Sequence, residues 1–394
     1  MYDFDQKLDR SKLHTMKWEY EQGRKRNPDL LCFGTAEMDF QAAPPILKAF
    51  QQVVDNGHFG YPYKREDYYQ AVIGYFKRHC QFEIKKEWIA NSVAIYPSFQ
   101  SLIEGLSDPG DEVIFQTPVH FIFADIVRSL KRVPVENPLK ETDGTYKMDF
   151  EDLKRKITPK TKLFLLCNPH NPVGRVWTRE ELTRVGEICL RHGVTVVSDE
   201  IHGELAFPGH VYLPFASLSD EFLRCSVTCI SPSKAFNIAG LQIANIVCAD
   251  EAMRRKIDKA ININEVCDVN PFGVIATIAA YNEGEEWLNQ LLDYLHGNYI
   301  CMRFFCREHL PDFPITRLEG TYLVWMDCRA LGIPSEVLEQ RLIDDAELWL
   351  NAGTMYGAEG EGFMRWNIAC PRARLIEGLR RFVSFAHPTD YNVK

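Results

Sequence analysis

The sequence predicts an α/β protein whose larger part is a three-layer α/β/α arrangement around a mostly parallel sheet. In the middle of the chain short apolar runs alternate with amphipathic segments: DEVIFQTP precedes FADIVRSLKR, and KLFLLCNP precedes TREELTRVGEICLRHG. This order is the rhythm of βαβ units. The apolar runs are continuous, as strands are when helices cover both faces of a parallel sheet.

A change of pattern near residue 285 predicts a second, smaller α+β domain. The stretch EEWLNQLLDYLHGNYICMRFFCREHL reads as one long amphipathic helix. After it we expect strands in GTYLVWMDCR and GFMRWNIACP, and a closing helix in ARLIEGLRRFVSF. The first 45 residues lack the alternating rhythm, and we expect them to pack with the C-terminal part. This divides the chain into a large domain, residues 46–285, and a small domain, residues 1–45 and 286–394.

The composition argues against binding of nucleic acid or of an anionic membrane. Of the 394 residues, 46% are hydrophobic and 25% are charged, and the 45 basic and 54 acidic residues give a net charge of −9. A negative net charge is unfavourable for contact with a polyanion. We therefore expect a globular protein that acts on a small molecule.

Cysteine usage indicates a reducing compartment. The 12 cysteines lie mostly inside apolar runs such as LFLLCNP and IVCAD, with no paired CxxC spacing. This distribution is typical of core residues, and it indicates neither a disulfide framework nor a metal site. The N-terminal MYDFDQKLDRSK lacks the apolar stretch of a signal peptide. We expect the protein to stay in the cytoplasm.

Lys234 is the most informative residue of the chain, in the segment SVTCISPSKAFNIAG (226–240). It follows an apolar run, and Ser231 and Ser233 precede it. A lysine in a dry environment is a candidate for a Schiff base with a carbonyl compound, and the two hydroxyls could hold a phosphate beside it. Pyridoxal 5'-phosphate (PLP) has both groups. The alternative is a strand-end lysine whose ammonium group reaches water.

Asp199 and Asn171 follow two other apolar runs, in VTVVSDEIHGE and CNPHNPVGRVW. Chemistry in parallel sheets collects at such carboxyl ends of strands. A carboxylate there could pair with the pyridine nitrogen of PLP and keep it protonated, and an Asn amide could donate to the ring oxygen. The alternatives are an Asp that caps the next helix and an Asn that serves the turn.

Two further segments supply candidate anion sites. A helix that begins near Ser98, in YPSFQSLIEGL, would present free N–H groups and the positive end of its dipole to a phosphate, although most helices begin in this way and bind nothing. Arg365 interrupts the apolar run GFMRWNIACP. A guanidinium binds a carboxylate bidentately, so Arg365 is the candidate for the α-carboxylate of an amino-acid substrate. The alternative is a structural ion pair at a sheet edge.

Taken together, these motifs resemble the fold-type I PLP enzymes of the class I/II aminotransferase group, and within it the MalY/PatB-type cystathionine β-lyases, also called C–S lyases. The resemblance covers nearly the whole chain and implies that residues 46–285 form the PLP-binding domain. It is carried by AEMDFQAAPP (36–45), GHFGYPY (57–63), CNPHNPVGRVWT, SDEIH, SPSKAFN, GTYLVWMD and FMRWNIACPR.

The resemblance implies roles for the residues around the cofactor ring. It implies that Lys234 binds PLP through a Schiff base and later acts as the acid/base catalyst. Asp199 would pair with the pyridine nitrogen, and Asn171 would contact the ring oxygen. His202 occupies the position where many aminotransferases have a tyrosine as second ring-oxygen donor, and the lyases also have His there. Arg365 would hold the substrate carboxylate.

The resemblance also implies how the phosphate is held. Ser231 and Ser233 would lie on the phosphate side, together with the backbone around Ser98 and Phe99. Tyr61 resembles the tyrosine that reaches the phosphate of the neighbouring subunit, which implies a homodimer with shared sites.

Three positions depart from the common pattern of the group. His120 stands where relatives usually stack a tyrosine on the cofactor ring, and we expect its titration to alter the pH profile. Tyr96 replaces the glycine or small residue that often opens the phosphate loop. Gln242 stands where many aminotransferases have an arginine for the phosphate, and the lyases share its absence.

We therefore expect a PLP-dependent C–S β-lyase that cleaves cystathionine or a related S-substituted cysteine to a thiol, pyruvate and ammonia. An aminotransferase of broad or aromatic specificity is the alternative, because it shares the same residues and differs only in where the carbanion is reprotonated. A regulatory protein that retains the fold is a third hypothesis, and the presence of Lys234 speaks against it.

Overall fold

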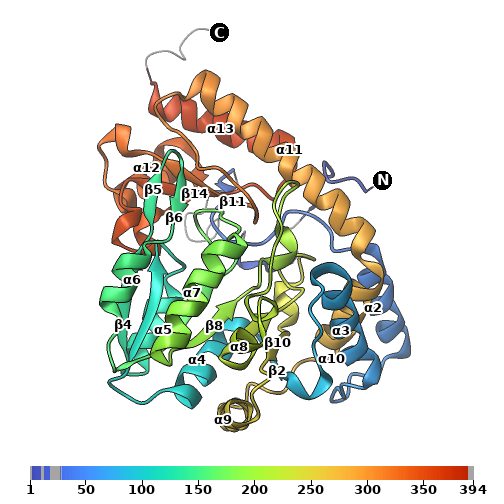
Figure 1. Cartoon of the computed structure of the whole chain (residues 1–394). Coiled ribbons are helices and arrows are strands. Elements are labelled where there is room, and N and C mark those ends of the chain that lie inside the picture. The colour runs from blue at the N-terminus through green and yellow to red at the C-terminus, as the bar shows by residue number, and fades with distance from the viewer. Residues whose placement is uncertain (1, 10–12, 18–26, 28, 389–394) are drawn as a thin grey trace.

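A seven-stranded sheet lies at the centre of the computed structural model, which describes residues 2–9, 13–17, 27 and 29–388 (Figure 1). The strand order is β2-β10-β9-β8-β7-β3-β4. β10 runs antiparallel to both of its neighbours, and the other pairs are parallel. The predicted mostly parallel sheet is therefore confirmed. The strands are β2 (Ile89–Ser92), β3 (Glu112–Thr117), β4 (Val133–Pro138), β7 (Thr161–Cys167), β8 (Thr195–Asp199), β9 (Ser226–Ile230) and β10 (Ala244–Val247).

Helices cover both faces of this sheet, which explains why its strands are apolar throughout. In β7, Leu163 and Leu165 belong to one cluster of buried side chains, and Phe164 and Leu166 belong to another. Successive strand residues point to opposite faces, so each face needs apolar residues of its own. The first cluster includes residues of α4 (Ile95–Leu106), α5 (Ile122–Ser129) and α9 (Glu251–Ile263), and the second includes residues of α6 (Phe150–Lys156), α7 (Arg179–His192) and α8 (Asp220–Arg224).

The chain after residue 284 forms the predicted long helix, followed by the predicted strands and closing helix. The long helix, α11, has 25 residues, and α13 lies beside it (Figure 1). Strand β14 pairs antiparallel with β11 and with β13. The boundary between the two domains stays a prediction. Among the described residues, no helix has both the length and the apolar character to cross a membrane. The elements are α11 (Glu285–His309), β11 (Leu323–Asp327), α12 (Ser335–Ala346), β13 (Asn351–Ala352), β14 (Phe363–Asn367) and α13 (Arg372–Ala386).

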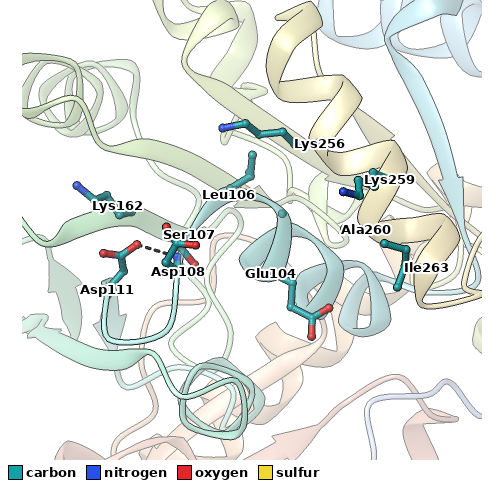
Figure 2. A pocket seen from close by; sticks show the side chains of 11 residues that line it. Glu104, Leu106, Ser107, Asp108, Asp111, Lys162, Lys256, Lys259, Ala260 and Ile263 are labelled. Atoms are coloured by element: carbon teal, nitrogen blue, oxygen red, sulfur yellow. Dashed lines mark hydrogen bonds between the residues drawn. The ribbon is translucent and has the colours of Figure 1, made fainter.

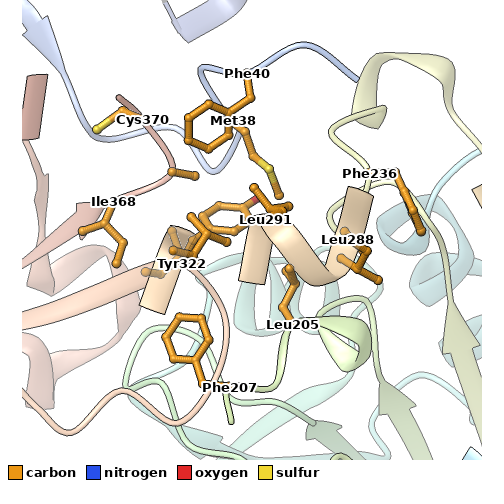
Figure 3. Close-up of a cluster of buried hydrophobic side chains, with 14 of the residues drawn as sticks. Met38, Phe40, Leu205, Phe207, Phe236, Leu288, Leu291, Tyr322, Ile368 and Cys370 are labelled. Carbon is orange, nitrogen blue, oxygen red and sulfur yellow. The ribbon is translucent and has the colours of Figure 1, made fainter. Parts of the chain in front are cut away.

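The N-terminal segment packs with the C-terminal part, as its sequence suggested. Strand β1 (Leu31–Cys32) pairs in parallel with β12 (Leu348–Trp349). Further along, Met38 and Phe40 join a buried cluster with Leu288 of α11 (Figure 3). This cluster holds the segment between the two parts of the molecule. The remaining elements are α2 (Pro44–Asn56), α3 (Glu66–Cys80), β5 (Lys140–Thr142), β6 (Thr145–Lys147) and α10 (Pro271–Glu283).

Candidate active site

Three neighbouring strands of the sheet end at the candidate site. Asp199 is the last residue of β8, Asn171 lies in the turn after β7, and Lys234 lies in the turn after β9. β7, β8 and β9 run parallel and side by side, so their carboxyl ends meet at one edge of the sheet. The fold thus brings together three residues that lie far apart in the sequence.

The amino group of Lys234 lies in surroundings that disfavour its protonated form. Its Nζ donates to the carbonyl oxygen of Ala36 at 2.6 Å. Burial and the nearby charge of Arg365 lower the pKa of Lys234 to about 8, while Glu37 and Asp199 act in the opposite direction. With this pKa, a large fraction of the Lys234 side chains is neutral near pH 8. The neutral amine is the form that attacks a carbonyl or accepts a proton.

The carboxyl group of Asp199 is enclosed by protein. The residue is 5% exposed, and one carboxyl oxygen accepts from the amide of Ile201 at 3.2 Å. Burial raises the pKa of Asp199 to about 7. No α-helix follows for it to cap, because the next element is the 3-10 helix Gly203–Leu205. A buried carboxylate gains most from a cationic partner, which the protonated nitrogen of a bound pyridine ring would supply.

Arg365 lies in the middle of β14, with its guanidinium against Asn171. The residue is 2% exposed. Its Nη1 donates to Oδ1 of Asn171 at 3.3 Å and its Nη2 to the carbonyl of Gly34 at 2.5 Å, and the group lies 5.0 Å from the ring centre of Tyr356. Within the described part of the chain it forms no ion pair, and its Nε has no partner. A buried guanidinium with only neutral acceptors is suited to an anionic ligand.

Two histidines, the half-buried His120 and the buried His202, belong to the same region. The ring of His120 stacks on that of Tyr96 with centroids 5.1 Å apart, and His202 meets Tyr322 edge-on at 6.0 Å. Burial lowers the pKa of His120 to about 3 and holds the pKa of His202 well below its ordinary value, and nearby cationic side chains add to both effects. The His120 ring therefore stays neutral at physiological pH. This low pKa argues against our expectation that the titration of His120 shapes the pH profile, and the profile itself stays a prediction.

The helix that we expected to face the phosphate begins earlier than predicted. Its first residue is Ile95, after Ala94, and not a residue near Ser98. The hydroxyl of Ser98 donates to the carbonyl of Ala94 at 2.6 Å, and the side chain of Phe99 is part of the core. The amides of Ile95 and Tyr96 stand in the first turn, where the helix supplies no acceptor. These two amides, which sequence reasoning did not single out, are among the N–H groups that could bind an anion at this helix end.

The two predicted serines lie between the end of β9 and Lys234, whereas the predicted tyrosine lies elsewhere. The hydroxyl of Ser231 donates to the carbonyl of Ile243 at 2.6 Å and accepts from the amide of Ser233 at 3.2 Å. Tyr61 is fully exposed. Within one chain the structure does not bring Tyr61 together with the other site residues.

Sequence reasoning missed the backbone of residues 34–36. The carbonyl oxygens of Gly34 and Ala36 accept hydrogen bonds from Arg365 and Lys234, respectively. A carbonyl group occurs in every residue and gives no signal in a sequence. The only local hint was the motif AEMDFQAAPP, which the resemblance quoted without a role.

Two cavities help to delimit the site. A cavity of about 430 Å³ lies beside His120 and is also lined by Thr117 and Tyr356. A larger cavity of about 540 Å³ lies between α4 and α9, with Lys162 and Lys256 among its lining residues (Figure 2). None of the predicted site residues lines this larger cavity, whereas His120 lines the smaller one.

Comparison with known proteins identifies the family. The family model for aminotransferase class I and II matches residues 28–382. The chain belongs to this family. It is 40% identical over 380 residues to cystathionine β-lyase PatB of Bacillus subtilis strain 168, across 96% of this chain and 98% of the relative. It is 30% identical over 390 residues to protein MalY of Escherichia coli K12, across 98% of each chain.

Solved structures of the family agree with the fold. The structure of cystalysin from Treponema denticola, which contains a PLP cofactor, is similar to this chain with a TM-score of 0.96 and 30% identity, and the match covers 98% of this chain and 99% of cystalysin. The family assignment and this similarity make the protein a PLP-dependent enzyme of the C–S lyase and aminotransferase group.

The residues present fit PLP. Around Lys234, three buried nitrogen atoms have no hydrogen-bond partner among the described residues: Nε of Arg365 and Nδ1 of His120 and His202. Buried polar atoms without partners cost free energy unless a ligand or water satisfies them. Asp199 adds a carboxylate suited to a cationic ring. Which residue contacts which atom of the cofactor stays a prediction.

Proposed function

We propose that the protein is a C–S β-lyase that cleaves cystathionine or a related S-substituted cysteine to a thiol, pyruvate and ammonia. The observation that carries the proposal is the arrangement of Lys234 and Arg365, which both donate to carbonyls of residues 34–36. A proton acceptor thus lies beside a candidate carboxylate-binding group. The similarity to PatB, which is named a cystathionine β-lyase, supports the sulfur-containing substrate.

Arg365 binds and orients the substrate. The α-carboxylate of an amino acid replaces the carbonyl of Gly34 on the guanidinium and forms a bidentate pair, which is stronger than the contact that it displaces. Asn171, whose Oδ1 lies 3.3 Å from Nη1 of Arg365, keeps the guanidinium in position. With the carboxylate fixed there, the Cα proton is directed at Lys234.

Lys234 moves the proton. PLP, when bound, supplies an aldehyde that captures the substrate amine and a cationic ring that stabilises the electron pair released at Cα. Nζ of Lys234 accepts the Cα proton, and the negative charge of Asp199 favours the protonated ring nitrogen. The C–S bond at Cβ then breaks, and the sulfur leaves as a thiolate with the bonding electrons. Water converts the resulting enamine to pyruvate and ammonia.

The test is to incubate the holoenzyme with L-cystathionine in the absence of any keto acid. We expect equal amounts of pyruvate and free thiol to accumulate over many turnovers. The matched control is Lys234→Ala in the same assay, which should release neither product. Absence of both products with the unmodified enzyme would exclude the lyase assignment for cystathionine, and a panel of S-substituted cysteines then tests the wider class.

An aminotransferase is the second candidate, because Lys234, Asp199 and Arg365 serve both reactions. The two differ in where the proton returns after it leaves Cα. His202 and Gln242 favour the lyase, since the resemblance places other residues at these positions in many aminotransferases. Amino transfer that depends on an added keto acid, without release of thiol, would establish the aminotransferase in its place.

We also propose that two chains form a homodimer with shared sites. Phe59, Tyr61 and Tyr63, in the segment between α2 and α3, are 59%, 102% and 83% exposed. Large apolar side chains gathered on a surface mark an interaction site. A second copy of the chain would cover them, and Tyr61 would then reach the phosphate bound by the partner.

A further inference from the structure

Residues 316–321, between α11 and β11, are bonded to two turns of the candidate site. On one side, the amide of Glu319 donates to the carbonyl of Gly174 at 2.8 Å, in the turn after β7. On the other side, the carbonyl of Glu319 accepts from the amide of Phe207 at 2.9 Å, and the amide of Thr321 donates to the carbonyl of Leu205 at 2.9 Å. Phe207 and Leu205 lie in the segment that follows β8. One short segment therefore holds the turns that carry Asn171 and His202.

The side chain of Glu319 adds a buried ion pair to these backbone contacts. Its Oε2 accepts from Nε of Arg175 at 2.8 Å and from the amide of Val176 at 3.0 Å. Arg175 is 6% exposed and Glu319 is 7% exposed. Removal of one member would leave the other charge buried without compensation. The pair is therefore a rigid connection rather than a surface salt bridge.

Arg175 is fixed on its other sides as well. Its Nη2 donates to Glu181 at 2.9 Å, its Nη1 donates to the carbonyl of Tyr146, and its guanidinium lies 4.8 Å from the ring centre of Trp177. A planar guanidinium with three anchored donors has a single orientation. The backbone of Arg175 is thereby fixed with it.

The turn that carries Asn171 is closed by Arg175. The amide of His170 donates to the carbonyl of Arg175 at 2.8 Å, and the amide of Gly174 donates to the carbonyl of His170 at 2.9 Å. Gly174 has a φ of +73°, and a Cβ atom there would lie 2.3 Å from Cδ1 of Leu318. The turn is thus packed directly against residues 316–321, and a shift of that segment displaces Asn171.

We propose that Glu319, through Arg175, is a positioning residue that sets the location of Asn171 and His202 relative to the cofactor ring oxygen. This assignment concerns cofactor geometry, so it applies to a lyase and to an aminotransferase alike. A donor to the ring oxygen stabilises its deprotonated form. Loss of that alignment should therefore raise the pH at which the absorbance of the bound cofactor titrates, and should weaken PLP binding.

The decisive variant is Glu319→Gln, which keeps the shape of the side chain and removes its negative charge. The matched control is Glu181→Gln, which removes the other carboxylate partner of Arg175 but leaves residues 316–321 bonded to both turns. For Glu319→Gln we expect PLP affinity of the apoenzyme to fall at least tenfold and the spectral pH midpoint to rise. For Glu181→Gln we expect both values to stay close to those of the unmodified enzyme.

Thermal unfolding of both variants separates positioning from a general structural role. Equal losses of stability with unequal spectral midpoints support the proposal. A midpoint and a PLP affinity in Glu319→Gln that match those of Glu181→Gln would overturn it, whatever the stability. If Glu319→Gln does not fold, Arg175→Lys provides the same two readouts, because lysine keeps the charge but cannot contact all of the partners at once.

A double variant tests the path through Asn171. In Asn171→Ala, one of the two donors to the ring oxygen is already absent, so adding Glu319→Gln should change the spectral midpoint less than it does in the unmodified chain. Full additivity of the two changes would show that Glu319 acts elsewhere. All of these readouts are independent of thiol release, so their failure is distinct from failure of the proposed reaction.

Discussion

At the scale of the residue, the proposed reaction gives Lys234 two tasks that depend on the same desolvated amine. In that proposal it holds the cofactor covalently and later accepts the Cα proton. Its pKa of about 8, lowered first by burial and then by Arg365, suits both, because each step needs the neutral form.

Replacement of Lys234 by alanine should abolish both tasks. We expect no covalent PLP after borohydride reduction and mass spectrometry, and a fall in turnover of about 10²–10⁴-fold or more, which is the usual contribution of a general acid/base group. The exposed Lys154→Ala is the control and should retain covalent PLP and full turnover. Undiminished turnover in Lys234→Ala would overturn the assignment.

His120 gives a pH prediction whose sign follows from its burial. Its folded pKa of about 3 lies below its ordinary value, so the unfolded chain binds a proton between about pH 6.5 and 3 that the folded chain does not. His120 therefore lowers the free energy of unfolding as the pH falls below 6.5, by about 2 kcal/mol at pH 5.

The variant His120→Phe should remove this loss. We expect its free energy of unfolding in urea to fall less than that of the unmodified protein between pH 7.5 and 5. The pH profile of kcat/KM above pH 6 should keep its shape, because a neutral ring has no proton to lose there. A new or displaced limb in that profile would contradict the neutral state of His120.

At the scale of the element, α7 begins with a capping box. The hydroxyl of Thr178 accepts from the amide of Glu181 at 3.2 Å, and the Glu181 carboxylate accepts from the amide of Thr178 at 3.0 Å. This helix covers one face of the sheet and carries none of the predicted site residues, so we expect its cap to contribute to stability and not to chemistry.

Thr178→Ala should therefore cost about 1 kcal/mol of unfolding free energy, the usual value for loss of an N-cap side chain. Urea unfolding measures the loss, and Thr178→Ser, which keeps the hydroxyl, is the control. Turnover should be unchanged at a temperature where both variants are folded. A loss of turnover without a loss of stability would mean that α7 takes part in the site.

Elements with a local signal were predictable, and elements fixed by distant partners were not. The continuous apolar runs predicted the parallel strands. Asp199 and Asn171 became site candidates because they are polar residues at the carboxyl ends of such runs. The antiparallel insertion of β10 between β2 and β9 has no local pattern. The start of α4 at Ile95 was missed because its N-cap, Ala94, has no side-chain hydrogen-bonding group. Residues 34–36 were missed because they act through carbonyl groups.

At the scale of the whole molecule, the prediction with the largest consequence is the shared site of a homodimer. The exposed aromatic residues between α2 and α3 lie outside the site of their own chain. If Tyr61 completes the site of the partner, a defect in Tyr61 and a defect in Lys234 can complement each other when they lie on different chains.

Complementation can be measured with two differently tagged chains, Lys234→Ala and Tyr61→Ala, expressed together and purified through both tags. Each variant alone should be inactive or weakly active. In the mixed dimer one site combines an intact Lys234 with an intact Tyr61 from the other chain, and the second site lacks both. We therefore expect about half of the unmodified activity. Tyr63→Ala in place of Tyr61→Ala is the control. A mixed dimer no more active than either parent, or a monomer by light scattering, would exclude shared sites.

The pairing of β1 with β12 and the contact of Gly34 with Arg365 also constrain the order in which the enzyme matures during synthesis. Leu31, Cys32 and Gly34 have partners more than 300 residues later in the chain, so the candidate carboxylate-binding corner cannot assemble before β14 has been synthesised. The strands of the central sheet can pair before that point, since their partners are complete by β10. The nascent protein therefore gains its scaffold first, and its competence to bind substrate only after β14 has been synthesised.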